Sequence, residues 1–239
     1  MLTIARGELI QIFRNRLVLV TALVLPAALS AFFIAKHDVF TDIGSLGYIA
    51  TLALFFVAGI GLYTTTVTTL ASRRQNLFLK RLRSTAAGDA GILGGLLLPI
   101  TALSVLQIAV ILGALAMVAG TPANPVLLVA AVVSVVAMML ALGLATAGLT
   151  NSPEHAQVTT LPVSLGVIAV SGWVGVTGTT DLTLLKRLLP GGSATELVLD
   201  AWNGGRPLAD SLVLFGPTLA WVVVAVVLAT RLFRWEPRR

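Results

Sequence analysis

The chain has 239 residues, of which 57% are hydrophobic and only 11% are charged, and its mean hydropathy is +0.97. Soluble domains carry roughly 25% charged residues, and a domain of this length cannot bury runs of about 20 apolar residues on all sides. The composition therefore excludes a water-soluble protein and predicts an all-α integral membrane protein. Because the chain has no cysteine, disulfides, thiol catalysis and thiolate metal sites are also excluded.

The net charge is +6 and the isoelectric point is about 10.8. Such values point to nucleic-acid binding when the basic residues share a soluble face. Here they lie between apolar runs, so membrane lipids and topology explain them and no nucleic-acid partner is expected.

Residues 1–16, "MLTIARGELIQIFRNR", predict a helix that lies in the membrane surface. A helical wheel places Leu9, Ile10 and Phe13 on one side and Arg14 on the other, although Arg6 is out of place. The alternative is a signal peptide, because a basic start precedes an apolar run that contains "AALSA". The length of that run, 17–35, favours the surface helix followed by a span.

Six apolar runs are long enough to cross about 30 Å of hydrocarbon. The third begins near "GILGGLLLP", so we expect its first turns to break or to lie at the interface before Pro99. The whole chain is expected to form one six-span domain, with spans at 17–35, 49–70, 92–119, 126–149, 158–176 and 212–229.

The distribution of Lys and Arg predicts the orientation of these spans. With both termini in the cytoplasm, the cytoplasmic segments hold twelve basic residues and the outer segments hold four. Because such residues are retained inside, we expect a multi-pass protein of the cell's inner (plasma) membrane with both termini cytoplasmic.

The longest connection, residues 177–211, lies on the outer side in this topology. A loop of that length is rarely structureless, and residues 182–189 and 193–202 predict two short amphipathic helices folded against the outer membrane face. Ser193 is a candidate N-cap, and Glu196 three residues later would complete a capping box.

The spans lack the chemistry that several membrane functions need. They contain no Asp, Glu, Lys, Arg or His, which disfavours an ion-driven carrier. Both His37 and His155 fall in loops and no HExxH occurs, so neither an intramembrane hydrolase nor a metal site is expected. No GxxxxGK[ST] motif is present, so any ATP hydrolysis must belong to a separate chain.

A threonine cluster ends the second span, with Thr64, Thr65 and Thr68 among its members. These hydroxyls can bond to carbonyls of their own helix, or they can line a substrate path. Pro162 is expected to bend the fifth span. Small residues four apart, such as those at 109 and 113 or at 143 and 147, permit close helix approach.

The segment 71–91 contains "ASRRQNLFLKRLRST", which places five cations beside the second span. On a wheel of one continuous helix the cations gather on one side, with Leu77 as the only apolar residue among them. The segment is either a simple cytoplasmic anchor or a docking element for another protein, and the segregation of charge favours docking.

The combination resembles the membrane subunit of an ABC exporter of the type 2 class, and it is similar to small actinobacterial drug-efflux permeases. The resemblance covers nearly the whole chain and depends on the order and spacing of its parts. These are the amphipathic start, "SRRQNLFLKRLRST", "LPVSLGVIAVSGW" and "LLPGGSATELVLDAWNGG".

The resemblance implies a permease dimer, formed with a second copy or a paralogue, that carries ABC ATP-binding subunits which bind ATP and Mg²⁺. It assigns contact with the ATPase to the first surface helix and to the segment after the second span. Where the family often has a Glu after the Arg of this segment, the chain has Gln75, which puts any carboxylate role there in doubt. The residues that the resemblance assigns to this contact are Phe13, Arg14, Arg73, Arg74, Lys80, Arg81 and Arg83.

The spans are uncharged and poor in aromatics, which suits a hydrophobic or amphiphilic cargo such as a drug or a lipid better than a sugar polymer. The candidate substrate path consists of Thr64, Thr65, Thr68 and Pro162. Two alternatives stay open, namely an ion-coupled carrier or channel that works without an ATPase and a non-transporting membrane anchor subunit.

Overall fold

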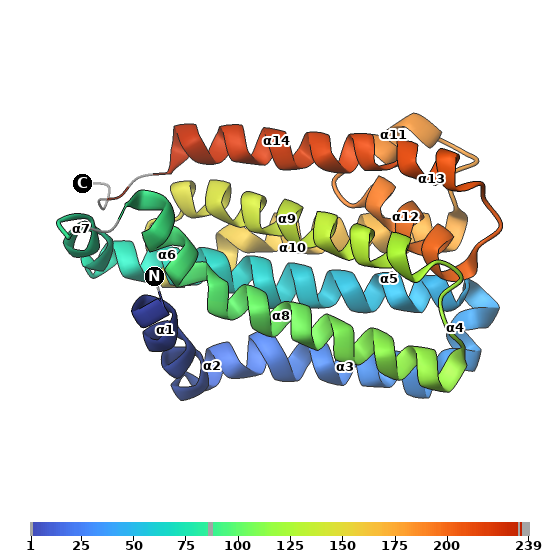
Figure 1. The fold of residues 1–239 in the computed structure, drawn as a ribbon, viewed down its shortest axis with the longest axis horizontal. Coiled ribbons are helices and arrows are strands. Elements are labelled where there is room, and N and C mark those ends of the chain that lie inside the picture. Colours follow the sequence, from blue (N-terminus) through green and yellow to red (C-terminus); the bar gives the residue numbers. More distant parts are fainter. Residues whose placement is uncertain (1, 86–87, 234, 236–239) are drawn as a thin grey trace.

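The computed structural model describes residues 2–85, 88–233 and 235, so the arginines at 234, 238 and 239 that entered the charge count lie outside it. Long helices run side by side along the longest axis (Figure 1). Five helices are long and apolar enough to cross a membrane among the described residues, or six if a helix pair bent by 78° counts as one span.

The predicted spans are all present as helices. The first comprises α2 (Arg16–Leu19), the π-helical segment η1 (Val20–Val24) and α3 (Leu25–Ala35), after which α4 (His37–Ile43) turns away. The second comprises α5 (Leu46–Phe56), the π-helical segment η2 (Val57–Tyr63) and α6 (Thr64–Gln75). The others are α8 (Asp89–Ala119), α9 (Pro125–Leu149), α10 (Pro153–Thr177) and α14 (Phe215–Leu232), which the short α13 (Leu208–Val213) precedes.

The second span is the centre of the bundle, because 83% of its most apolar stretch is buried, against 61% or less for α8, α9, α10 and the last span. Helices α3, α9 and α10 pack around it, and η1 of the first span lies against η2. Fully buried Ile49, Phe55 and Tyr63 supply its largest core side chains.

The expected break at Pro99 is wrong, because α8 is one helix of 31 residues with Pro99 inside it. Membrane helices tolerate an internal proline where neighbouring groups satisfy the backbone. In the same turns the Thr101 hydroxyl donates to the Leu97 carbonyl at 2.8 Å, and Pro99 is buried against the rest of the bundle.

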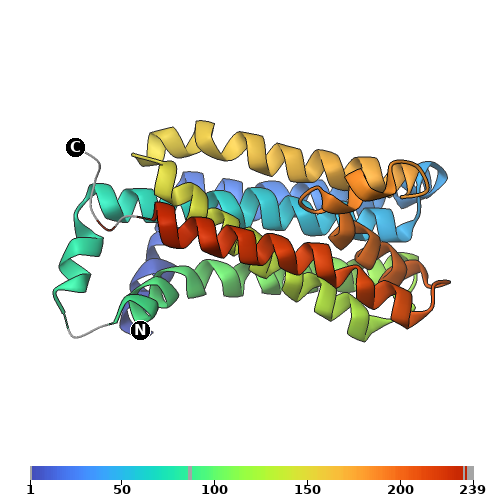
Figure 2. The ribbon, with the colours of Figure 1, turned by 90° about the horizontal axis from the view of Figure 1, so that it is seen from above.

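The short helices mark the two ends of the bundle. α1 (Leu2–Arg14) and α7 (Phe78–Arg83) lie at the same end as the last turn of α14, with α1 across the spans (Figures 1 and 2). α4, α11 (Thr183–Leu188), α12 (Gly192–Asn203) and α13 lie at the opposite end. The two short helices expected before the last span are thus present, but α12 is enclosed by α5, α9, α10 and α14 and does not rest on the outer face.

Candidate functional site

The basic segment after the second span is two helices joined by a left-handed residue. α6 ends at Gln75, the Leu77 amide donates to the Arg74 carbonyl at 3.0 Å, and Leu77 has φ 55° before α7 begins. The prediction of one continuous helix with all cations on one face is therefore wrong. The break turns α7 away from the axis of α6 (Figure 2). Arg73 and Arg74 of α6 are partly or fully buried, whereas the three cations of α7 are exposed.

Arg74 lies inside the protein and is only 3% exposed. Its guanidinium donates to the carbonyls of Ala147, at 2.8 Å, and Thr150. These carbonyls end α9, where a helix carries partial negative charge and lacks internal donors. Arg74 therefore stabilises the contact between α6 and α9 and is absent from the exposed basic surface.

Arg73 joins the second span to the first helix. Its Nε lies 2.7 Å from Glu8 Oε1 of α1, it donates to the Gln11 side chain, and its guanidinium lies 5.5 Å from the Phe78 ring centre. Both partners of this ion pair are mostly buried. Arg73 is thus engaged in holding α1 against α6.

The exposed part of the segment forms a basic corner, which we define as Asn76, Leu77, Lys80, Arg81 and Ser84. These residues surround a hollow of about 410 Å³. Leu77 is 47% exposed, and Lys80 and Arg81 are exposed beside it. Leu77 is thus an exposed leucine held in a left-handed conformation, which non-glycine residues rarely adopt, and it lines the same hollow as two cations.

Arg83 connects the end of α7 to two other segments. Its guanidinium donates hydrogen bonds of 3.1 and 3.2 Å to the carboxylate of Asp89, at the start of α8, and it lies 5.0 Å from the ring centre of Trp235. Trp235 in turn meets Phe233 edge to face. The chain after the last span is thereby tied to α7.

The remaining residues predicted for the ATPase contact and the substrate path occupy mixed surroundings. Phe13 and Arg14 are exposed on α1. Thr65 is buried, and the hydroxyls of Thr64 and Thr68 bond to carbonyls of their own helix, as one of the two interpretations expected. Pro162 lies exposed within the continuous helix α10.

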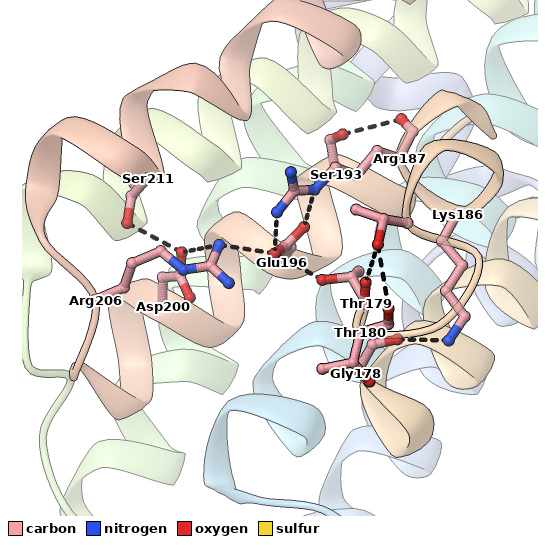
Figure 3. A network of polar contacts seen from close by, with 11 residues as sticks. Gly178, Thr179, Thr180, Lys186, Arg187, Ser193, Glu196, Asp200, Arg206 and Ser211 are labelled. Carbon is pink, nitrogen blue, oxygen red and sulfur yellow. Dashed lines mark hydrogen bonds and ion pairs between the residues drawn. The ribbon is translucent and has the colours of Figure 1, made fainter.

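At the opposite end, Glu196 is the centre of a polar network (Figure 3). Its carboxylate, 5% exposed, accepts hydrogen bonds from Arg187 at 2.7 Å, Arg206 at 2.7 Å and Thr179 at 2.8 Å. The network joins α11, α12 and the loop before α13. The predicted capping box is wrong, because Gly191 is the N-cap and the Ser193 hydroxyl donates to the Arg187 carbonyl.

The two carboxylates of this network have opposite pKa shifts. Burial alone would raise the pKa of Glu196, but the hydrogen bonds from Arg187, Arg206 and Thr179 outweigh it, and the pKa is lowered. Burial raises the pKa of Asp200, which the hydrogen bond from Ser211 and the charge of Arg206, 3.2 Å away, offset only in part. Glu196 is therefore the firmly ionised partner of the two arginines.

Lys186 lies against the C-terminal end of α10. Although 2% exposed, its ammonium donates to the Thr177 hydroxyl at 2.8 Å and the Gly178 carbonyl at 2.7 Å, and it lies 5.0 Å from the Trp173 ring centre. A cation at a helix C-terminus complements the partial charge there. Sequence reasoning missed both this contact and the Glu196 network, because the partners of Lys186 and Glu196 lie eight to seventeen residues away along the chain, with no helical period.

No group of three or more His, Cys, Asp or Glu side chains suited to a metal ion occurs among the described residues. No protein-family model and no curated protein matches the chain. Within the described part, the fold is that of an all-helical protein with five or six helices capable of crossing a membrane.

Proposed function

We propose that the chain is the membrane subunit of an ATP-driven ABC exporter, which forms with a second permease copy the path for a hydrophobic or amphiphilic substrate. ATP and Mg²⁺ bind to separate ATPase subunits on the cytoplasmic side. The observation that carries the proposal is the basic corner, where exposed Leu77 lines the same hollow as exposed Lys80 and Arg81 beyond the end of the central span.

The corner has the chemistry of a docking surface. The exposed leucine can be buried in an apolar pocket of a partner protein on binding, and the neighbouring cations can pair with acidic residues of that partner. Simple topological anchoring does not require an exposed leucine there. The corner also continues directly into α6, so force applied to α7 would reach the most buried helix of the bundle.

In this mechanism, closure of the ATPase subunits on ATP presses on α7. The second span, which ends in α6, moves with α7, and the permease dimer changes between inward-open and outward-open or collapsed states. Coupling requires contacts that differ between these states, and Lys80 and Arg81 supply them. Arg73 and Arg74 serve inside the permease, because their guanidinium groups are occupied by α1 and α9.

The test is reconstitution of the full chain with the ATPase encoded beside it. L77S and K80E/R81E should enter the membrane normally but lose copurification and stimulation of ATP hydrolysis. R6E/R231E is the matched control, because both arginines are exposed and lie outside the corner. Equal stimulation in all three proteins would overturn the docking proposal.

The same preparation separates the alternative functions. Substrate flux by the purified chain in liposomes without nucleotide would identify an ion-coupled carrier or a channel. Binding to a partner without any flux would identify an anchor subunit.

A further inference from the structure

A polar groove separates the first helix from the second span, at the end of the bundle that carries α7. Its volume is about 810 Å³. One wall consists of α1 and α2, the other consists of the last turns of α6, and Pro153 of α10 contributes to the lining. The ion pair between Arg73 and Glu8 thus joins the two helices, α1 and α6, that form the walls of the groove.

The charges that line the groove are unbalanced. Arg14, Arg16 and Arg73 line it together with a single carboxylate, that of Glu8. Glu8 is paired with Arg73. Arg14 and Arg16 are exposed and have neither an ion pair nor a side-chain hydrogen bond within residues 2–85, 88–233 and 235. Among the described residues, the carboxylate that lines the groove is therefore paired with Arg73 and not with Arg14 or Arg16.

Helix α1 also exposes apolar side chains at and beside the groove. Ile10, which lines the groove, is 49% exposed, and Phe13 on the same helix is 54% exposed. Because α1 lies across the spans and leads directly into the first of them (Figure 1), these side chains lie at the level where hydrocarbon meets headgroups. In this membrane placement, the arginines of the groove and the apolar side chains of α1 lie side by side at the depth of the lipid phosphates.

We propose that the groove between α1 and α6 binds the headgroup phosphate of an anionic phospholipid. Arg14 and Arg16 bind the phosphate oxygens, for which the planar guanidinium is well shaped. The hydroxyls of Thr69 and Ser72 line the opposite wall as further donors, and the acyl chains lie along Ile10 and Phe13. Basic pockets beside spans on the cytoplasmic side suit such headgroups.

This inference rests on the membrane placement in the proposed function but not on the ATPase. Resemblance assigns Arg14 to the ATPase contact, whereas the groove gives Arg14 a lipid partner. Measuring lipid binding to the purified permease without any ATPase distinguishes the two assignments, because an effect of Arg14 on lipid binding cannot then arise from contact with the ATPase.

The experiment measures binding of labelled phosphatidylglycerol and phosphatidylcholine to the purified full chain in neutral detergent. R14Q/R16Q should weaken phosphatidylglycerol binding about tenfold, because each arginine near an anionic headgroup contributes appreciably. R6Q is the matched control, since Arg6 is exposed on α1 but does not line the groove. R6Q should bind phosphatidylglycerol as the unmodified chain does, and phosphatidylcholine binding should stay weak throughout.

Three results would overturn the proposal. Unchanged phosphatidylglycerol binding by a folded R14Q/R16Q would remove the site, and an equal loss in R6Q would show a general charge effect. Full displacement of the lipid by millimolar inorganic phosphate would assign the groove to a free anion. Folding of each variant is checked by its elution profile and its helical circular dichroism. The single variant R16Q is milder and should show an intermediate loss of phosphatidylglycerol binding.

Discussion

The guanidinium of Arg74 donates to the Ala147 carbonyl at 2.8 Å, so a charge from the basic segment completes the end of a membrane helix 73 residues further along the chain. The contact joins α6, the end of the central span, to α9. The basic segment therefore contains two kinds of arginine. One kind is structural and buried, and the other is exposed on the basic corner.

Replacing Arg74 should therefore destabilise the protein itself. R74M leaves the terminal carbonyls of α9 without their donor, and charge-assisted hydrogen bonds of this kind contribute roughly 1.5 to 3 kcal/mol. Thermal unfolding of the purified protein in detergent measures the loss. R81M is the control, because Arg81 is exposed. Equal midpoints for R74M and R81M would contradict a structural role for Arg74.

The contacts of Arg83 predict local rather than global effects. At exposed sites a cation–π contact contributes about 0.5 to 1 kcal/mol, so W235A should leave the unfolding midpoint nearly unchanged but speed amide hydrogen exchange in α7. R83Q loses the contact with Asp89 as well as the contact with Trp235. Exchange in α7 should therefore be faster in R83Q than in W235A. If W235A exchanged as slowly as the unmodified chain, the segment after α14 would not restrain α7.

Hydropathy was enough to locate the long apolar helices, five or six of which could cross a membrane among the described residues, because a run of about 20 apolar residues leaves little choice of structure. The wheel failed on the basic segment because it assumes one helix, and nothing in "RRQNLFLK" marks Leu77 as left-handed. The burial of Arg74 depends on where α9 ends, which local sequence does not reveal. Ser193 and Glu196 have capping-box spacing, but ion pairs with Arg187 and Arg206 outweigh that local preference.

Two glycines that look alike in sequence differ in their surroundings. A Cβ on Gly143 of α9 would lie 2.8 Å from Thr66 Cγ2, in the buried contact with the central span, whereas a Cβ on Gly113 of α8 would meet nothing within 4 Å. G143A should cost about 1 to 3 kcal/mol through overpacking, while G113A should be neutral or stabilising by up to about 1 kcal/mol through helix propensity. Thermal unfolding of the two variants side by side tests this, and a harmless G143A would contradict the tight contact.

The Glu196 network predicts a pH dependence at the outer end. Because the folded-state pKa of Glu196 is lowered, its ion pairs contribute stability above the ordinary value of 4.5, and this contribution is lost as the pH falls through the lowered value. At pH 7, E196Q should cost about 2 kcal/mol, since Arg187 and Arg206 lose a charged acceptor. The gap between the unfolding midpoints of the unmodified chain and E196Q should narrow below about pH 4.5. D200N should cost less at pH 7, because burial already disfavours the ionised form of Asp200. A gap that stays constant from pH 7 to pH 3.5 would show that the carboxylate charge of Glu196 does not hold the outer helices.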